Sequence, residues 1–331
     1  MQKDSRRDPK PVAQAIREAR TVAVCCHVNP DGDAIGSSLA MVHGLEKMGK
    51  TADAYCQDKV PDNLMFLPGA ENVLKAEQAE GKQYDLLLCV DTATGDRMGT
   101  CARLKKQCTV SAQVDHHGTN PGYTDFNDID GNASSNSLLV HELLKTLDVE
   151  IDTEIAMCLY AGISTDTGNF AFGSTEPEAF SVMSELMETG MPLDRMNRIL
   201  FRERAKAQVL LMGRAINSMQ FLKDGRLAVM TLTLKDFEEC GALPEHADTL
   251  VNVGLDTVGT KLALLARENA DGKIKFSLRA VPPMTVDQIA VSFNGGGHGQ
   301  AAGITMEGIS LQDAVAKVVS AMSAYLDGIK E

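Results

Sequence analysis

Several kinds of residue are scarce in this sequence, and each scarcity argues against one class of function. Tryptophan is absent, and aromatic residues make up 5% of the 331 residues, so extended base-stacking platforms for long single strands are not expected. Acidic residues outnumber basic ones, and the net charge is −13. This charge argues against an open groove for long nucleic acid, because neutralising a run of phosphates needs clustered Lys and Arg. No stretch reaches the roughly 18 consecutive apolar residues of a membrane span.

The eight cysteines form no C-x-x-C pair. Several lie within apolar runs, as Cys25 and Cys26 do in TVAVCCH, and this is typical of reduced core thiols. The N-terminal segment MQKDSRRDPK has no apolar core, so a secretory signal is not expected. These features predict a cytoplasmic protein.

Length and patterning predict two domains, since a domain typically takes about 150 residues. In the first half, apolar runs alternate with helical patterns. Strands are expected over 21–27, 51–56, 84–92 and 108–117, and helices over 33–49, 133–148 and 153–165, with a short helical stretch around 97–106. This alternation predicts an α/β fold with a parallel sheet.

A nearly all-helical stretch from 175 to about 218 precedes a change of pattern. A hairpin over 221–233, a strand pair over 260–267 and 273–280, and helices over 285–293 and 311–326 indicate a smaller α+β domain. We therefore expect an α/β domain over 1–200, a helical connector over 201–217 and a smaller α+β domain over 218–331.

Acidic and imidazole side chains gather where the predicted strands and one helix end. They are His27, Asp31, Asp33, Asp91, Asp115, His116, His117 and Asp166. In open α/β sheets, ligands bind outside the carboxyl ends of the strands. Any one of these aspartates taken alone is more simply a helix cap or a turn residue. Carboxylates from several segments would repel one another unless cations offset their charge, so together they predict a metal site.

The ligand types narrow the choice of metal. Mixed carboxylate and imidazole ligands without thiolate suit Mn²⁺, Mg²⁺, Fe²⁺ or Zn²⁺. The candidates outnumber the ligands that one ion needs, and two ions sharing one carboxylate are the arrangement used in phosphoester hydrolysis. Four carboxylates, those of Asp31, Asp33, Asp91 and Asp166, would balance the charge of two divalent ions.

The motifs HVNPDGDAIGSSLA, VDTA, DHH and TDTG occur in this order and resemble the four motifs of the DHH phosphoesterase superfamily. GGGHGQAAG resembles the signature of the DHH-associated C-terminal domain. The pattern is most similar to that of the small two-domain oligoribonucleases and 3′-phosphoadenosine-5′-phosphate (PAP) phosphatases called NrnA-type. One departure is Asn169, where many relatives carry a basic residue.

The resemblance implies that the domain over 1–200 is catalytic and that the domain over 218–331 binds substrate, with the active-site cleft between them. It also implies a role for each candidate residue. One Mn²⁺ would be held by His27, Asp31 and Asp91, and a second by Asp33, Asp91, His116 and Asp166, with Mg²⁺ or another divalent ion as a substitute. Asp115 would orient the DHH turn. His117 would contact the scissile phosphate or help to protonate the leaving oxygen.

The glycine run before His298 has two interpretations. Glycine lets backbone N–H groups approach phosphate closely, but such runs also serve as plain turns. The resemblance implies that Arg279 and His298, with Gly296 and Gly297, bind a terminal phosphate or nucleotide. Arg97 would face phosphate or form an exposed salt bridge. The segment Ser134–Asn136 is most simply a helix cap.

The expected function is a Mn²⁺-dependent phosphohydrolase of short nucleotides. It would act as an exonuclease that releases 5′-mononucleotides from oligoribonucleotides of a few units, or as a PAP phosphatase, or as both. A phosphodiesterase of cyclic or linear dinucleotides is one alternative. A non-catalytic nucleotide- or RNA-binding module is another, although a pure binder needs no metal ligands. The expected partners are short oligoribonucleotides or small nucleotides, without long nucleic acid or membrane, and a homodimer is compatible with the sequence.

Overall fold

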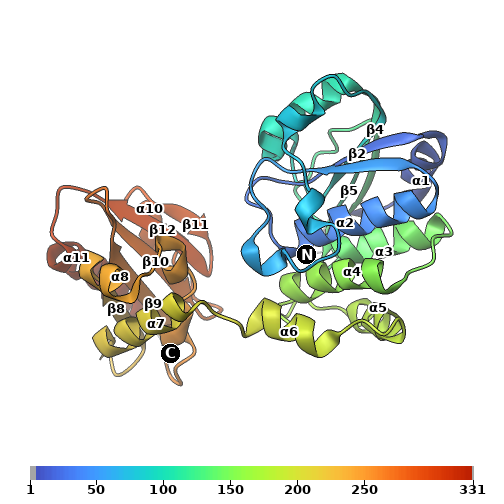
Figure 1. Ribbon diagram of the computed structural model, residues 1–331. Helices are drawn as coiled ribbons and strands as arrows, with labels where there is room; N and C mark the ends of the chain where they lie inside the picture. Colours follow the sequence, from blue (N-terminus) through green and yellow to red (C-terminus); the bar gives the residue numbers. More distant parts are fainter. Residues whose placement is uncertain (1–4, 330–331) are drawn as a thin grey trace. The chain divides into compact units, whose positions relative to one another are not determined.

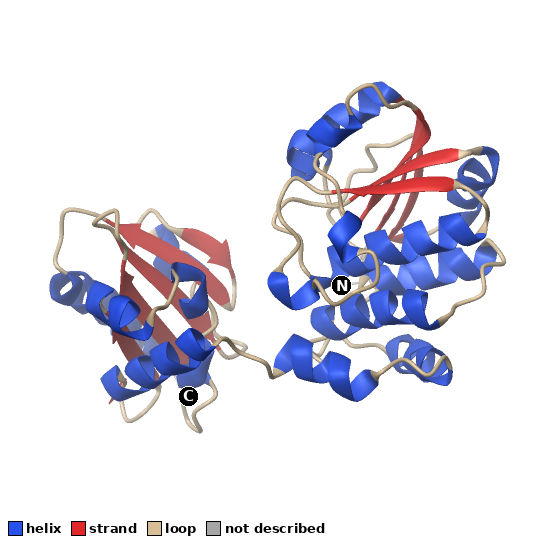
Figure 2. Ribbon diagram, in the orientation of Figure 1, coloured by secondary structure: helices blue, strands red, loops and turns tan. Residues whose placement is uncertain are grey.

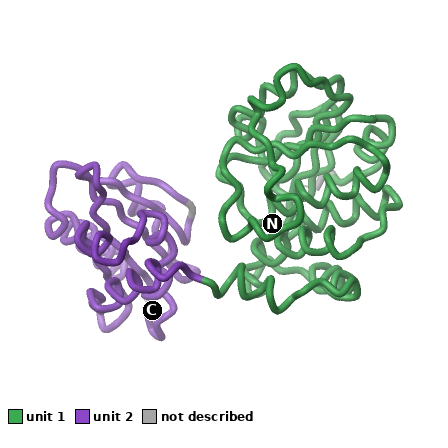
Figure 3. Tube along the Cα trace, in the orientation of Figure 1, with its two compact units in different colours: residues 1–203 green, residues 204–331 purple. Residues whose placement is uncertain are grey.

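The computed structural model describes residues 5–329, and for Ser5, Arg6 and His298 it describes the backbone alone. The chain divides into two compact units, residues 1–203 and residues 204–331 (Figure 3). Each unit has its own sheet and its own hydrophobic core. Among the described residues, no helix combines the length and the apolar character needed to cross a bilayer.

Unit 1 is built on a sheet whose strand order is β1-β6-β5-β4-β2-β3. The strands are β1 (Ser5–Arg6), β2 (Thr21–Cys25), β3 (Thr51–Tyr55), β4 (Tyr84–Val90), β5 (Cys108–Asp115) and β6 (Phe126–Asp130). All neighbours are parallel except β1, which pairs antiparallel with β6. The order reverses between β2 and β4, which makes a topological switch point, the place where open α/β sheets bind ligands. The predicted parallel α/β fold is confirmed.

Helices cover both faces of this sheet (Figures 1 and 2). One face packs against α1 (Pro9–Glu18), α2 (Gly32–Lys47), α3 (Asn136–Thr146) and α4 (Thr153–Asp166), with α5 (Pro177–Glu188) and α6 (Leu193–Phe201) beyond them. The other face packs against the 3₁₀ helices η3 (Ala76–Ala79) and η4 (Gly95–Gln107), while η1 (Asp62–Leu64) and η2 (Ala70–Asn72) lie in the connection after β3. In β2, Val24 joins the first core and Cys25 the second. Because both faces are buried, the strands are continuous apolar runs.

The sequence analysis did not identify α1 or β6. Helix α1 does carry a helix signal, because Asp8 caps it, Pro9 stands at its start and its buried apolar residues lie on one face. Strand β6 carries none, because its sequence FNDID does not alternate apolar with polar residues. Asp128 of β6 is fully buried. Its Oδ1 accepts a hydrogen bond from Asp8 N at 3.1 Å, and Arg7 Nε lies 3.8 Å from the same oxygen. Contacts with the start of the chain therefore stabilise a strand that the local sequence does not favour.

Unit 2 has a mixed sheet of order β11-β12-β10-β9-β8-β7. Its strands are β7 (Gln220–Leu222), β8 (Leu227–Leu232), β9 (Leu262–Glu268), β10 (Ile274–Ala280), β11 (Gly296–His298) and β12 (Ala301–Met306). Its helices are α7 (Lys206–Ser218), α8 (Leu234–Cys240), η5 (Pro244–Ala247), α9 (Val251–Leu255), α10 (Asp287–Val291) and α11 (Leu311–Gly328). Only β8 and β9 are parallel neighbours within the described part of this sheet. The predicted smaller α+β domain is confirmed.

The glycine run is a strand, although its sequence indicates an open loop or turn. Residues 296–298 form β11, which pairs antiparallel with β12 and places Gly297 opposite Ala302. A Cβ atom on Gly297 would lie 2.3 Å from the carbonyl oxygen of Ala301, closer than such atoms can approach. Glycine is therefore required here by the close pairing of β11 with β12.

Candidate metal centre

The eight side chains predicted at the ends of strands and helices lie at the carboxyl edge of the unit 1 sheet. His27 follows β2, Asp31 and Asp33 open α2, and Asp91 follows β4. Asp115 ends β5, His116 and His117 follow it, and Asp166 ends α4. All of them except Asp115 contribute ligand atoms to three groups, and within each group all atoms lie within 4.8 Å of one another. The groups are His27, Asp31 and Asp91; Asp33, His116 and Asp166; and Asp91, His116 and His117. Residues that are far apart in the sequence thus meet at the switch point.

Asp91 lies at the middle of this cluster. Its Oδ2 is 3.4 Å from His27 Nε2, and its Oδ1 is 3.3 Å from His116 Nε2. The backbone of Asp91 has a φ of +50°, which is uncommon for a residue other than glycine and is found mainly where function requires it. Oδ1 is buried and accepts no hydrogen bond. A buried carboxylate oxygen without a donor fits a bound cation.

Asp33 is fully buried and is held at the N-terminus of α3. Its Oδ1 accepts hydrogen bonds from the backbone N–H and the hydroxyl of Ser137, at 2.9 and 2.5 Å, and its Oδ2 accepts one from the backbone N–H of Asn136. The first N–H groups of a helix have no intrahelical partner and favour negative charge. Helix α3 therefore positions this carboxylate and favours its ionised form, in opposition to the effect of burial.

Gly162 of α4 makes room for this contact. A Cβ atom at position 162 would lie 1.9 Å from Ser137 Oγ and 2.5 Å from Asp33 Oδ1. Sequence reasoning singled out neither Ser137 nor Gly162. Neither residue carries a local signal, because their importance comes only from the packing of α2, α3 and α4.

Two of the three imidazoles of the cluster, those of His27 and His116, present Nε2 to the carboxylates. His27 Nδ1 is 2.8 Å from Val28 O, and His116 Nδ1 is 3.3 Å from Ala133 O. A carbonyl acceptor keeps a proton on Nδ1 and leaves Nε2 free to bind a metal. Asp31 is the N-cap of α2 and accepts from two backbone N–H groups through Oδ1, so its Oδ2 remains available, 3.7 Å from His27 Nε2.

The DHH turn contains a second hydrogen-bonded network. Asp115 is fully buried and accepts hydrogen bonds from His117 N at 3.2 Å and from Asn120 Nδ2 at 2.7 Å, while His117 Nδ1 lies 2.9 Å from its Oδ1. Asn120 Nδ2 also faces Thr92 O at 3.2 Å and Gln113 Oε1 at 3.0 Å. Sequence reasoning missed Asn120, which connects the ends of β4 and β5.

The pKa values of the side chains in the cluster show that the cluster favours positive charge. Burial and the charge of Asp91 raise the pKa of Asp33 to about 6, and burial and the charge of Asp33 raise the pKa of Asp166 to about 9. Burial lowers the pKa of His116, but Asp91 and Asp33 outweigh it and raise the pKa to about 10. Burial likewise opposes Asp31 and Asp91, which raise the pKa of His27 to about 11. The cluster thus retains protons that divalent cations would displace, so the residues present fit divalent metal binding.

The other predicted site residues lie outside the cluster. Arg97 is exposed, and its carbonyl accepts a hydrogen bond from Val28 N at 2.8 Å, which joins η4 to the segment after His27. Ser135 is the N-cap of α3, so the capping interpretation is confirmed for this residue. In unit 2, Arg279 is half-buried, and the strand register places Arg279, Ala301 and His298 in one row across β10, β12 and β11. The side chain of His298 lies outside the described part of the structure.

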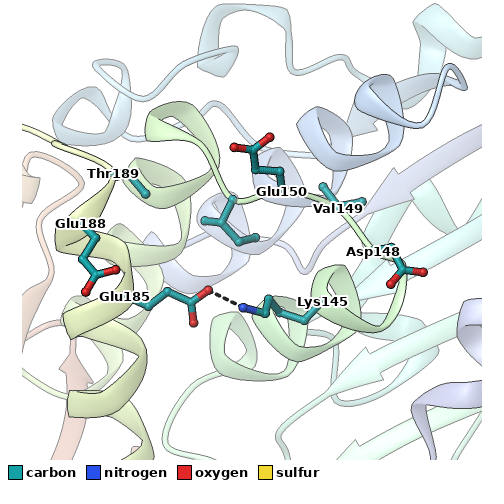
Figure 4. A pocket seen from close by; sticks show the side chains of 8 residues that line it. Lys145, Asp148, Val149, Glu150, Glu185, Glu188 and Thr189 are labelled. Carbon is teal, nitrogen blue, oxygen red and sulfur yellow. Dashed lines mark hydrogen bonds and ion pairs between the residues drawn. The ribbon is translucent and has the colours of Figure 1, made fainter.

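A cavity of about 610 Å³ lies elsewhere in unit 1, around the ends of α3 and α5 (Figure 4). It is lined by Lys145, Asp148, Val149, Glu150, Ile151, Glu185, Glu188 and Thr189. Lys145 Nζ is 2.6 Å from Glu185 Oε1, and the other charged lining residues are acidic. A phosphate would be repelled there, so this cavity does not suit a nucleotide.

Comparison with known proteins gives a consistent picture. Residues 21–163 match the DHH family, N-terminal domain, and residues 225–326 match the DHHA1 domain. The chain is 32% identical to the bifunctional oligoribonuclease and PAP phosphatase NrnA of Thermus thermophilus, over 95% of this chain and 93% of the relative. It is 26% identical to the protein of the same name from Bacillus subtilis, over 86% and 89%. The crystal structure of an exopolyphosphatase-related protein from Bacteroides fragilis superposes with a TM-score of 0.86 at 27% identity, covering 96% of both chains.

Proposed function

Because the chain belongs to the DHH family and is a phosphoesterase, we propose that it hydrolyses short nucleotides with a pair of divalent cations, Mn²⁺ in the first place. The observation that carries this proposal is the sharing of ligands. Asp91 and His116 each belong to two of the three ligand groups, and Asp91 directs one carboxylate oxygen to each imidazole. A shared carboxylate between two ions is the arrangement that phosphoester hydrolysis uses.

The proposed ligands divide into two sets. One ion would be held by His27, Asp31 and Asp91, and the other by Asp33, Asp91, His116 and Asp166, and Mg²⁺ or another divalent ion would fit the same donors. When bound, such a pair polarises phosphoryl oxygens and lowers the pKa of water.

The residues of the DHH turn would move the proton. His117 Nδ1 lies 2.9 Å from Asp115 Oδ1, a carboxylate that accepts a proton donor, and 40% of the His117 side chain is exposed. Its Nε2 is then the atom that can deliver a proton to the leaving oxygen of the ester. Asp115 would hold the imidazole in this tautomer, and Asn120 would hold Asp115.

The curated relatives direct the choice of substrate. Their names, bifunctional oligoribonuclease and PAP phosphatase, support both activities. This chain would release 5′-mononucleotides from oligoribonucleotides of a few units and remove the 3′-phosphate from PAP. The net charge of −13 favours short substrates over long ones. In unit 2, Arg279 and His298 would bind a terminal phosphate, with Gly296 and Gly297 beside them. In unit 1, Arg97 would be a phosphate-facing residue. The eight free cysteines fit a cytoplasmic, reducing environment.

The test is hydrolysis of a substrate panel by the purified full-length chain. The panel contains end-labelled RNA from dimers to long strands, PAP, and cyclic and linear dinucleotides, each with Mn²⁺, with Mg²⁺ and with a chelator. We expect Mn²⁺-dependent release of mononucleotides from the shortest RNAs and of phosphate from PAP. Preferential cleavage of cyclic or linear dinucleotides would favour a dinucleotide phosphodiesterase instead. Binding without turnover by the metal-loaded protein would contradict the proposal.

A further inference from the structure

Phe172 is an exposed aromatic residue close to the candidate metal centre. The chain has few aromatic residues, yet 58% of the surface of Phe172 is accessible to solvent. It follows Asp166 by six residues, in the turn that leaves α4. The exposed ring adds little to the hydrophobic core, so packing does not account for its position.

The turn holds Phe172 in a defined place. The backbone N–H groups of Ala171 and Phe172 both donate to Thr167 O at 3.0 Å, and Phe170 N donates to Thr167 Oγ1 at 3.1 Å. Thr167 is itself buried, and its hydroxyl is anchored to Ile163 O in α4 at 2.6 Å. The ring is therefore presented by the end of α4 and does not belong to a free loop.

The ring lies close to the metal ligands. A Cβ atom on Gly168 would lie 2.4 Å from Cε1 of Phe172, so the ring rests against the backbone of Gly168. Since consecutive Cα atoms are 3.8 Å apart, this contact places the nearest edge of the ring within about 12 Å of the Asp166 Cα atom. Asp166 Oδ2 is 3.4 Å from His116 Nε2. The phosphate and the base of one nucleotide can span such a separation.

A second exposed phenylalanine lies next to this turn. Phe170 packs against Phe180 of α5 with ring centroids 5.3 Å apart and the ring planes tilted by 36°, and 55% of the surface of Phe180 is exposed. The pair supports the turn from the side of α5. Phe126, another exposed phenylalanine of unit 1, begins β6 and so lies at the opposite, amino edge of the parallel sheet.

We propose that Phe172 is a nucleobase-stacking residue of the catalytic site. The inference rests on the proposed function and deepens it, because it assigns a base to the substrate beside the scissile phosphate. Stacking on an aromatic ring tolerates every base, since each base has a π-face. A single ring accommodates one base, which suits a substrate of one or a few nucleotides. Longer strands need a row of such rings.

Kinetics with and without the base test the inference. The ratio of kcat/KM for an RNA dimer to kcat/KM for an abasic dimer, which keeps the sugar–phosphate backbone, measures the contribution of the base. Losing one stacking contact is expected to reduce this ratio by roughly tenfold or more in Phe172→Ala. Phe172→Tyr should restore it, and Phe126→Ala is the matched control. A Phe172→Ala ratio equal to that of the unmodified protein would overturn the inference. An unmodified protein that cleaves neither dimer would contradict the proposed function instead.

Binding can be observed directly because the chain contains no tryptophan. Phe172→Trp introduces a single indole at the proposed site, and Phe126→Trp introduces one at the other edge of the sheet. AMP is expected to quench the indole in Phe172→Trp, ribose 5-phosphate is not, and neither ligand should affect Phe126→Trp. Equal quenching by both ligands, or none in a variant that still cleaves RNA dimers, would refute base stacking. Light scattering on Phe172→Ala adds a further check, because a changed oligomeric state would assign the ring to a contact between copies of the chain.

Discussion

His117 Nδ1 lies 2.9 Å from Asp115 Oδ1, although the same nitrogen is 3.8 Å from Asp91 Oδ1 and its position would also allow metal binding. The shorter contact is the one with Asp115, whose other carboxylate oxygen accepts a hydrogen bond from Asn120 Nδ2 at 2.7 Å. His117 is therefore oriented by Asp115, and its Nε2 remains free for the substrate. The neighbouring histidine of the DHH turn, His116, has the opposite environment and directs Nε2 to Asp91 and Asp166.

The first prediction concerns Asp115→Asn. This change keeps the volume of the side chain but removes the charge that orients and stabilises the His117 imidazolium. We expect kcat to fall by about a hundredfold or more, with little change in KM or in Mn²⁺ affinity. Steady-state kinetics measure kcat and KM, and Mn²⁺ titration measures the affinity for the metal. Asp125→Asn is the control. Asp125 is likewise an aspartate that accepts hydrogen bonds, in its case from Ser111, but it lies away from the cluster. A parallel loss of Mn²⁺ affinity would assign Asp115 to the metals.

The second prediction concerns Asp91→Ala. The carboxylate serves both proposed ions, so its removal should lower kcat/KM by about a thousandfold or more, which corresponds to roughly 4 kcal/mol of transition-state stabilisation. Equilibrium dialysis should show fewer Mn²⁺ ions bound per chain. Asp62→Ala, an exposed aspartate paired with Lys59, controls for loss of surface charge. Full activity in Asp91→Ala would exclude the shared carboxylate.

The third prediction compares two glycines in helices. Gly162→Ala would press a methyl group against Ser137 and Asp33, and overpacking of this kind costs about 1–3 kcal/mol of the free energy of unfolding. The displaced Asp33 should also weaken Mn²⁺ binding. Gly213→Ala in α7 meets no atom within 4 Å and should instead stabilise its helix by about 0.5–1 kcal/mol. Denaturant titration followed by circular dichroism measures both changes, and destabilisation of equal size in the two variants would contradict the argument.

The fourth prediction links pH to metal binding. Without metal, the pKa values of His27, His116 and Asp166 are raised to about 11, 10 and 9. The folded chain then holds more protons on these groups than the unfolded chain between about pH 6.5 and pH 9, so the free energy of unfolding falls as pH rises through this window. Mn²⁺ needs deprotonated ligands, so the increase in Tm on adding Mn²⁺ should grow over the same window. Thermal unfolding with a chelator and with excess Mn²⁺ checks this. A pH-independent increase would mean that the ions do not displace these protons.

Some features of the fold could be predicted because their cause is local. The strands β2, β4 and β5 are buried on both faces, and their continuous apolar runs carry that information. Strand β6 could not be predicted in this way, because its Asp128 is stabilised by Arg7 and Asp8 from the start of the chain. The glycine run at 295–297 gives no strand signal either, although its last two residues belong to β11. Glycine is needed there because β12 approaches closely.

The residues of the candidate site also divide into those with a local sequence signal and those without one. Asp and His residues placed after apolar runs identify potential ligands, since strand ends can be located from the sequence. Asn120, Ser137, Gly162 and Phe172 carry no such mark. Asn120, Ser137 and Gly162 each contact residues of other elements, and Phe172 lies in a turn that only the fold brings close to the metal ligands. A single sequence does not show these contacts.

The sequence by itself determined which side chains stand at the ends of the strands and which chemistry they can perform, because strand limits and residue types are local properties. Only the tertiary structure decided that β2 and β4 are neighbours at the switch point. It also decided that one oxygen of Asp91 faces His27 while the other faces His116. The reason is physical: strand order and carboxylate orientation depend on the packing of α2, α3 and α4 against the sheet, and these contacts join residues more than a hundred positions apart.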